Sequence, residues 1–391
     1  MVGEWSSRNF GDCAALVRDT VSPAEALGAP YVGLEHIGEG TLSLVGRGVA
    51  ADVTSAKFRF RGRDILFGKL RPYFRKVVMA PFDGVCSTDI WVVRARDAVE
   101  QRFLFYYMAS PDFVGEATRA SEGTKMPRAQ WSYLSQLPLA LPPLSEQRAI
   151  AHILGTLDDK IELNRRMNAT LEAIARAIFK SWFVDFDPVH AKARGEQPHG
   201  MDAETAALFP DSFENSELGQ IPAGWGVGAL SNIADNPRRG IKPEAMDSNT
   251  LYIGLEHMPQ KSITLDAWGR TSNVASNKFK FRKGEFLFGK LRPYFHKVGI
   301  APDDGVCSTD ILVIVPTFEA WYGLTLFHIS SKEFIDYTTA ASTGTRMPRT
   351  NWDTMSKYPI VIPDPKVAEA FSCFLRPLLD TIEIAPGDTG L

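Results

Sequence analysis

The stretch Phe67-Gly-Lys-Leu-Arg-Pro-Tyr-Phe74 decides the organisation of the chain, because it returns unchanged as Phe288-Gly-Lys-Leu-Arg-Pro-Tyr-Phe295. Working outward, Tyr31-Val-Gly-Leu-Glu-His36 and Gly84-Val-Cys-Ser-Thr-Asp-Ile90 also return, each 221 residues later. Between 57–94 and 278–315, 26 of 38 aligned positions are identical, which is too many for chance. The segment 31–142 is therefore repeated as 252–363, and such a repeat governs the fold. Two similar surfaces on one chain suit a ligand that itself has two similar halves.

Length and composition favour a protein of two or three domains, since 391 residues with 45% hydrophobic content can fill several cores. No run of about 18 apolar residues and no signal-peptide core is present, so we expect a soluble, cytoplasmic protein without a membrane partner. The four cysteines form no CxxC pair, which favours buried free thiols over disulfides or zinc. A net charge of −3 means that any case for nucleic-acid binding depends on local clusters.

Each repeat predicts a compact α+β unit. Lys57-Phe-Arg-Phe-Arg61 and its copy alternate polar and apolar residues, as a half-buried strand does, and Ile90-Trp-Val-Val93 has the length of a buried strand. Segments 103–108 and 324–329 predict short helices beside these strands.

A long helix is predicted between the repeats. Ser145 is a good N-cap, and apolar residues then recur with a heptad spacing to about Phe186, some 40 residues or on the order of 60 Å. Asn164 and Asn168 fall in the same seam, where a buried Asn commonly fixes register. We interpret this helix as a spacer and a docking surface. The predicted partner-facing or coiled-coil residues are Ile150, Leu154, Leu157, Ile161, Asn164, Asn168, Leu171, Ile178 and Trp182.

The expected domain organisation has five parts. They are a first repeat (1–142), the long helix (143–187), a Pro- and Gly-punctuated linker (188–220), a second repeat (221–363) and a short distal helix with a tail (364–391).

Matched basic stretches are the main functional signal. In 57–76 and its copy, cations greatly outnumber acids, and strand alternation places Arg59 and Arg61 opposite Phe58 and Phe60. A basic loop, Gly123-Thr-Lys-Met-Pro-Arg128, returns as Gly344-Thr-Arg-Met-Pro-Arg349. Both features suit contact with DNA phosphates. The plainer alternatives are a solvated strand face and a loop that caps the next helix. The predicted DNA contacts are Lys57, Arg59, Arg61, Lys69, Arg71, Tyr73, Lys76, Lys125, Arg128, Lys278, Lys280, Arg282, Lys290, Arg292, Tyr294, Lys297, Arg346 and Arg349.

No motif predicts catalysis. The stretch 284–291 approaches a phosphate-binding loop, but Leu291 stands where the magnesium-binding hydroxyl is needed. Glu35-His36 and Glu256-His257 have no third ligand at metal spacing, so a hydrogen bond at a strand end is the better interpretation. Asn236-Pro237 lacks the aromatic residue that a base-methylating site uses for stacking. We therefore expect a non-enzyme with no cofactor and no metal.

In these motifs the chain resembles the specificity subunits of type I restriction-modification systems. The carrying elements are the repeated motifs, Leu141-Pro-Pro-Leu-Ser-Glu-Gln147 before the long helix, and the stretch that ends in Gly219-Gln-Ile-Pro-Ala-Gly-Trp225. The resemblance implies two target-recognition domains in a pseudo-two-fold arrangement, joined by helices that pair as an antiparallel coiled coil. It also implies that each domain reads one half of a split site on double-stranded DNA. Modification subunits that methylate adenine would dock on the helices, and a restriction subunit can join them.

The distal helix departs from this family pattern, because only 367–384 is helical after the second repeat. We therefore expect part of the apolar seam on the long helix to be uncovered. Base-reading residues should lie where the copies differ, above all in 39–56 against 259–277, and also in 103–120 against 324–341. Two alternatives stay open at this point: a stand-alone DNA-binding regulator, and a duplicated enzyme that uses the Glu-His pairs.

Overall fold

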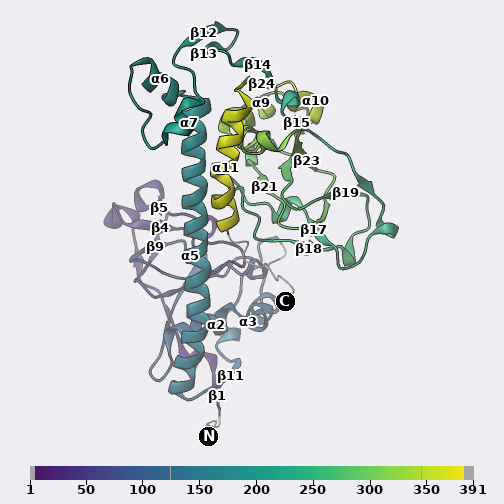
Figure 1. The fold of residues 1–391 in the computed structure, drawn as a ribbon. Helices are drawn as coiled ribbons and strands as arrows, with labels where there is room; N and C mark the ends of the chain where they lie inside the picture. Colours follow the sequence, from purple (N-terminus) through teal and green to yellow (C-terminus); the bar gives the residue numbers. More distant parts are fainter. Residues whose placement is uncertain (1–4, 124, 345, 383–391) are drawn as a thin grey trace. The chain divides into compact units, whose positions relative to one another are not determined.

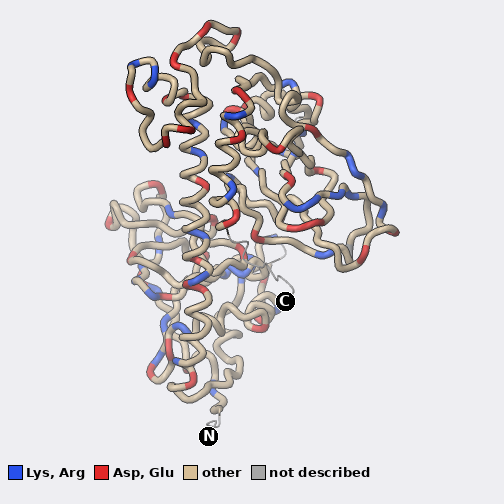
Figure 2. The backbone as a smooth tube through the Cα atoms, in the orientation of Figure 1, with Lys and Arg blue, Asp and Glu red and all other residues tan. Residues whose placement is uncertain are grey.

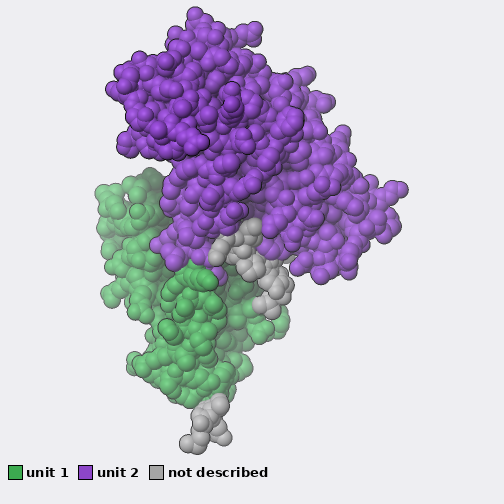
Figure 3. All heavy atoms as spheres, viewed as in Figure 1, with its two compact units in different colours: residues 1–160 green, residues 161–391 purple. Residues whose placement is uncertain are grey.

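The computed structural model describes residues 5–123, 125–344 and 346–382. They form two compact units, residues 1–160 and 161–391, and the boundary falls inside the long helix (Figure 3). Each unit contains one copy of the repeat, and each is mixed α and β, as the sequence predicts (Figure 1).

The central sheet of each repeat has four antiparallel strands in the same order. In unit 1 the order is β2 (Ala14–Val17), β10 (Ile90–Ala95), β7 (Ile65–Gly68) and β8 (Val77–Met79). In unit 2 it is β15 (Ala234–Asp235), β23 (Ile311–Pro316), β20 (Phe286–Gly289) and β21 (Val298–Ile300). The register is also repeated, since Ile90 faces Gly68 and Ile311 faces Gly289. The strands β7 and β20 are buried throughout, which explains their unbroken apolar sequence.

A second, five-stranded sheet is repeated in the same way. Its order is β3 (Thr20–Val21), β6 (Lys57–Phe60), β9 (Gly84–Cys86), β4 (Pro30–Val32) and β5 (Gly48–Val49) in unit 1. In unit 2 the strands are β16 (Gly240–Ile241), β19 (Lys278–Phe281), β22 (Gly305–Cys307), β17 (Leu251–Ile253) and β18 (Gly269–Arg270). One strand pair in each sheet is parallel, β4 with β9 and β17 with β22. The 67–74 motif thus links β7 to β8 within the central sheet, and the 84–90 motif links β9 of the second sheet to β10 of the central sheet.

Short helices cover the central sheet in each repeat. Unit 1 has α1 (Phe10–Cys13), α2 (Gln101–Ala109), α3 (Pro111–Arg119) and α4 (Trp131–Leu134); unit 2 has α8 (Tyr322–Ile329), α9 (Lys332–Ala340) and α10 (Trp352–Met355). The strand pairs β1 (Ser6–Asn9) with β11 (Pro138–Leu141) and β14 (Gly226–Ala229) with β24 (Pro359–Ile362) close the two domains. The helices predicted at 103–108 and 324–329 are therefore confirmed, as parts of α2 and α8.

The predicted long helix is α5 (Leu144–Phe183), which is 40 residues long. It ends before the expected position because Phe186 adopts a left-handed conformation with φ 54° and starts the short helix α6 (Asp187–Ala193). The distal helix α11 (Pro365–Thr381) packs beside the last turns of α5, and Phe371 contacts Phe179, Trp182 and Phe183 (Figure 1). The remainder of the predicted distal helix lies outside the described residues.

The segment predicted as a linker is folded onto unit 2. It contains α6, α7 (Ala203–Ala207) and a hairpin of β12 (Phe213–Ser216) and β13 (Gly219–Pro222). Val189 and Phe209 are fully buried in the same core as Trp225 and Phe371. Proline and glycine here mark tight turns within a folded segment.

The cysteines partly follow the prediction. Cys13, Cys86 and Cys307 are buried free thiols, and burial raises the pKa of Cys86 and Cys307 to about 12. Cys373, on α11, is instead exposed, which corrects the expectation of burial for all four. Within the described residues, no helix is both long and apolar enough to cross a membrane.

Candidate DNA-binding surface

The Gly-Lys-Leu-Arg-Pro-Tyr-Phe motif forms an identical tight turn in both repeats. Arg71 and Arg292 both have φ 51°, a left-handed conformation that is unusual for a residue with a β-carbon. The turn continues into a short 3-10 helix, Pro72–Phe74 in unit 1 and Pro293–Phe295 in unit 2. The tyrosines of these helices, Tyr73 and Tyr294, are about half exposed, at 51% and 49%.

The basic loop is anchored directly to this turn. The amide of Arg71 donates to the carbonyl of Pro127 at 2.7 Å, and the amide of Ala129 donates to that of Lys69 at 2.9 Å. Within the loop, Glu122 and Arg128 exchange two backbone hydrogen bonds. In unit 2 the matching bonds join Arg292 to Pro348 at 2.7 Å, Thr350 to Lys290 at 3.1 Å and Thr343 to Arg349. The turn and the loop are thus held together by backbone hydrogen bonds, whatever their side chains do.

A carboxylate in the third shared motif completes the anchor. Asp89 accepts two hydrogen bonds from the guanidinium of Arg128, at 2.9 and 3.3 Å, and Asp310 accepts one from Arg349 at 3.2 Å. The hydrogen bond to Asp89 raises the pKa of Arg128. Sequence reasoning missed both aspartates, although their place in the repeated motif was the available signal. The turn and the basic loop together form what we call the turn–loop surface. Its members are Lys69, Arg71, Tyr73, Lys125, Met126 and Arg128 in unit 1, and Lys290, Arg292, Tyr294, Arg346, Met347 and Arg349 in unit 2.

Most of the predicted DNA contacts are accessible. The exposed ones are Arg59, Arg61, Arg71, Tyr73, Lys125, Lys280, Arg282, Tyr294, Arg346 and Arg349. The half-buried ones are Lys69, Lys76, Arg128, Lys290, Arg292 and Lys297. Acidic and basic residues are interspersed over both units, so the signal lies in these local groups rather than in a uniform field (Figure 2).

Four of the predicted cations are engaged inside their own domains. Lys57 and Lys278 are only 4% and 7% exposed, in contrast to the expected outward strand face. The ammonium of Lys57 donates to Ser55 at 2.7 Å and lies over the ring of Tyr31, and Lys278 does the same with Ser276 and Tyr252. The strands β6 and β19 begin at these lysines, and each ammonium folds back onto the serine two positions earlier, outside the strand.

Lys76 and Lys297 are the other two engaged cations. They donate to the carbonyls of Leu34 and Leu255, and burial lowers the pKa of Lys297. These four lysines stabilise the domains and are removed from the candidate surface.

The strand cations of unit 1 line a separate groove. Arg59 and Arg61 face a cavity of about 630 Å³ that is also lined by Asp19, Glu25 and Asp83. Mixed charge makes this groove a weaker phosphate site than the turn–loop surface, because the acids repel a polyanion.

The Glu-His pairs are structural, as the sequence favours. His36 Nδ1 accepts a hydrogen bond from the Gly33 amide at 3.0 Å, and His257 accepts the same bond from Gly254. Burial lowers the pKa of His257. In the described part of the chain no group of three or more His, Cys, Asp or Glu side chains could hold a metal ion.

The predicted partner-facing residues of α5 fall into two groups. Leu154, Leu157 and Ile161 are exposed, at 36%, 55% and 39%, as expected for an uncovered apolar seam. The later residues pack within unit 2, where Asn168 and Ala175 are buried and Trp182 contacts Phe209. Ile150 packs partly against a core of unit 1.

The chain is similar in sequence to known proteins. A family model described as the type I restriction modification DNA specificity domain matches residues 30–173. The chain is 27% identical over 386 residues to the type I restriction enzyme HindI specificity subunit of Haemophilus influenzae, and the match covers 84% of each chain. Over residues 30–173 the chain contains the DNA specificity domain of type I restriction-modification systems, and the relatives that it matches are specificity subunits of such systems.

Further relatives carry the same description. The EcoDI specificity subunit of Escherichia coli is 30% identical over 214 residues, which cover 52% of this chain and 46% of the relative. The type I restriction-modification S subunit from M. genitalium has a similar fold, with a TM-score of 0.53 at 12% identity over 97% of this chain and 90% of that one. The family thus accounts for the duplicated domain and the long helix together.

Proposed function

We propose that this chain is the non-catalytic DNA-recognition subunit of a type I restriction-modification complex, in which each repeat contacts one half of a bipartite site. The observation that supports this most is the turn–loop surface, which is anchored by the same backbone hydrogen bonds in both repeats. A surface whose turn and backbone anchors are the same in two copies suits the DNA backbone, which is the same in both half-sites.

The shared cations would supply affinity rather than sequence choice. Arg71 with Lys125, and Arg292 with Arg346, lie at the junction of turn and loop. Replacing Arg71 and Arg292 by Ala should weaken binding to all DNA sequences. It should also lower the slope of log K against log salt by about 0.9 for each phosphate contact that is lost. A changed sequence preference with an unchanged slope would show instead that these residues read bases.

The divergent segments 39–56 and 260–277 would read bases. Arg47 stands opposite Trp268 in these segments, and Arg side chains can read base edges in the major groove. Replacing 260–277 by 39–56 should make the second half-site identical to the first. An unchanged methylation pattern would rule out this assignment.

Methyltransferase partners would dock on the uncovered part of α5, where Leu154 and Leu157 are exposed. Sequencing the methylated bases of cells that express this chain with its cognate modification subunit should reveal a two-part methylated motif. Full-strength methylation in cells that lack the chain would overturn the proposal. Binding of specific DNA without any methyltransferase partner would favour the stand-alone regulator.

A further inference from the structure

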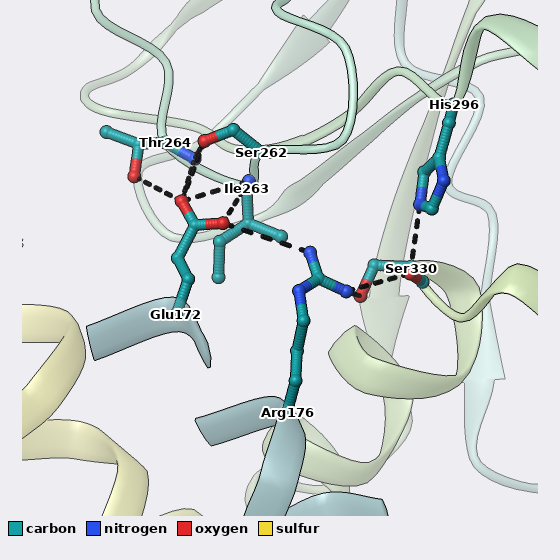
Figure 4. A network of polar contacts seen from close by, with 7 residues as sticks. All are labelled: Glu172, Arg176, Ser262, Ile263, Thr264, His296 and Ser330. Carbon is teal, nitrogen blue, oxygen red and sulfur yellow. Dashed lines mark hydrogen bonds and ion pairs between the residues drawn. The ribbon is translucent and has the colours of Figure 1, made fainter. Parts of the chain in front are cut away.

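Besides the apolar core that it shares with α5, the second repeat binds one buried carboxylate of that helix. Glu172, which is 5% exposed, accepts hydrogen bonds from the hydroxyls of Ser262 and Thr264, both at 2.7 Å. It also accepts bonds from the amides of Ile263 and Thr264 at 3.2 Å (Figure 4). Hydroxyl and amide donors that converge on one carboxylate satisfy a charge that would be costly to bury alone.

An arginine on the next turn extends this network. Arg176 lies 3.9 Å from Glu172 and donates to the carbonyl of Ser330 at 2.9 Å. That carbonyl also lies 3.0 Å from His296 Nε2 (Figure 4). Because a carbonyl oxygen only accepts, Nε2 is the ring nitrogen that donates this hydrogen bond. The carboxylate is thus bound directly by the segment 262–264, and Arg176 of α5 links it to the carbonyl of Ser330 in a second segment.

The first repeat keeps the donors of this site within a segment that otherwise diverges. Ser262, Ile263 and Thr264 correspond to Thr41, Leu42 and Ser43, so the hydroxyl–apolar–hydroxyl pattern is retained. In unit 1 the two hydroxyls bond to each other at 3.0 Å, and Thr41 is exposed. Among the described residues of that unit, no carboxylate bonds to either of them.

The surrounding backbone contacts are repeated as well. The amide of Gly40 donates to the carbonyl of Arg75 at 3.3 Å, as that of Lys261 donates to His296 at 2.8 Å. The side chain of Arg75 reaches the carbonyl of Ala109, the position that Ser330 occupies in the second repeat. The first repeat therefore has the same loop in the same place, with a cation of its own beside it.

We propose that Thr41, Leu42 and Ser43 form the binding site for a carboxylate carried on an α-helix of a partner protein. The hydroxyl and amide donors of this segment are suited to bind a carboxylate. In the second repeat the equivalent donors bind a carboxylate that lies on a helix. A second copy of this chain does not fit, because its Glu172 is already bound by its own Ser262 and Thr264.

The neighbours of the site specify the helix further. Asp266 lies 3.8 Å from Arg165, which is two helical turns before Glu172, but the corresponding residue of the first repeat is Val45, 66% exposed. The partner helix should therefore have an apolar residue seven positions before its glutamate, on the same face. Ala175, three positions after Glu172, is buried in the core of unit 2, so we expect a small residue at the same place of the partner helix.

A loop rearrangement accompanies binding. Leu42 has φ 55°, whereas Ile263, whose amide faces Glu172, has no positive φ. Leu42 must leave its left-handed conformation before its amide can take the orientation of Ile263. The proposed site is therefore assembled by the carboxylate.

The test uses a peptide of residues 161–178 with Arg165→Leu. A lactam bridge between positions 166 and 170, on the opposite side of the helix, keeps it helical. Fluorescence anisotropy should show that this peptide binds the full chain. The affinity should fall at least tenfold with the Glu172→Gln peptide, and equally with a Thr41→Val/Ser43→Ala chain.

Two controls separate this site from the occupied one. A Ser262→Ala/Thr264→Ala chain should bind the peptide as well as the wild type does; loss of binding would mean that the peptide displaces α5 and would overturn the proposal. So would an absence of binding, or equal affinity for the Gln peptide. Self-association that Thr41→Val/Ser43→Ala abolishes, measured by sedimentation, would assign the site to a second copy instead.

Discussion

The two repeats are most alike at the turn–loop surface and least alike in the segments 39–56 and 260–277. At the turn, Arg71 and Arg292 have the same φ and bond to the same loop position at the same 2.7 Å. In the divergent segments, the second repeat binds Glu172 while the first leaves Thr41 exposed. In the proposed function, the shared surface would contact the repeating DNA backbone, and the divergent segments would determine what each domain binds beside it.

The stability of the two units should differ most when Glu172 is replaced. Glu172→Gln places an amide NH2 group against the donors of Ser262 and Thr264 and removes the negative charge beside Arg176, which is 31% exposed and keeps its bond to Ser330. Unit 2 should lose about 3 kcal/mol of stability, since breaking a buried charged network is costly. Unit 1 should be unchanged. Native-state hydrogen exchange, which resolves the two units, provides the measurement.

The matched control for this change is Glu162→Gln, on the same helix. Glu162 pairs with Arg166 at the surface, so its replacement should cost less than about 0.5 kcal/mol. Equal effects of the two substitutions would mean that Glu172 does not fasten the second repeat.

The next difference is a pH dependence that only the second repeat has. His328 is fully buried against the ring of Phe179, and burial lowers its pKa to about 4; the corresponding residue of the first repeat is Tyr107. Because the folded pKa lies below the ordinary value of 6.5, the stability from neutral His328 is complete above pH 6.5 and falls as the pH drops towards 4. Unit 2 should lose about 2 kcal/mol between pH 7 and pH 5.

Hydrogen exchange in α8 and α9, corrected for the intrinsic rate, should show this loss, while α2 and α3 should not. Burial lowers the pKa of His257 and His296 too, and both act in the same direction. The His328→Gln variant should keep only the smaller pH-dependent loss of stability that His257 and His296 cause. A pH response as large as that of the wild type in this variant would exclude His328 as its source.

The sequence predicted the parts of the fold that local periodicity controls. The heptad placed α5 within a few residues, and the repeat predicted two copies of one α+β domain. The N-cap prediction was wrong, because the helix begins at Leu144 and Ser145 lies inside its first turn. The sequence also predicted that His36 would be satisfied by a backbone hydrogen bond.

Other features depended on contacts that no periodicity encodes. Strand alternation pointed Lys57 outward, but Ser55 and Tyr31 hold its ammonium inside. Glu172 bonds to residues about 90 positions away, and nothing in a helical pattern distinguishes a carboxylate that is buried from one that is solvated. Asp89 could have been found, since its motif is repeated, but a repeat shows that a residue is retained and not what it contacts.

The repeats should respond equally where they are alike. Asp89→Asn and Asp310→Asn each remove the charge that holds the basic loop through Arg128 or Arg349. Each change should weaken DNA binding by about 1 kcal/mol, roughly fivefold, because the loop cation is positioned less well. Equilibrium binding at fixed salt provides the comparison. An effect confined to one repeat would show that only that domain uses its turn–loop surface on DNA.

The smallest expected effect tests the backbone of the divergent loop. Gly40 and Lys261 are equivalent and have φ 71° and 61°, but only lysine has a β-carbon that this conformation disfavours. A β-carbon at Gly40 would meet nothing within 4 Å, so Gly40→Ala tests the conformation alone. It should destabilise unit 1 by about 0.5–1 kcal/mol. Alanine strains the folded loop at this φ, and this cost is larger than the stabilisation that comes from the lower entropy of the unfolded chain. Lys261→Gly should stabilise unit 2 by a similar amount. If Lys261→Gly destabilises unit 2 instead, the side chain of Lys261 stabilises the folded loop by more than its backbone strain costs.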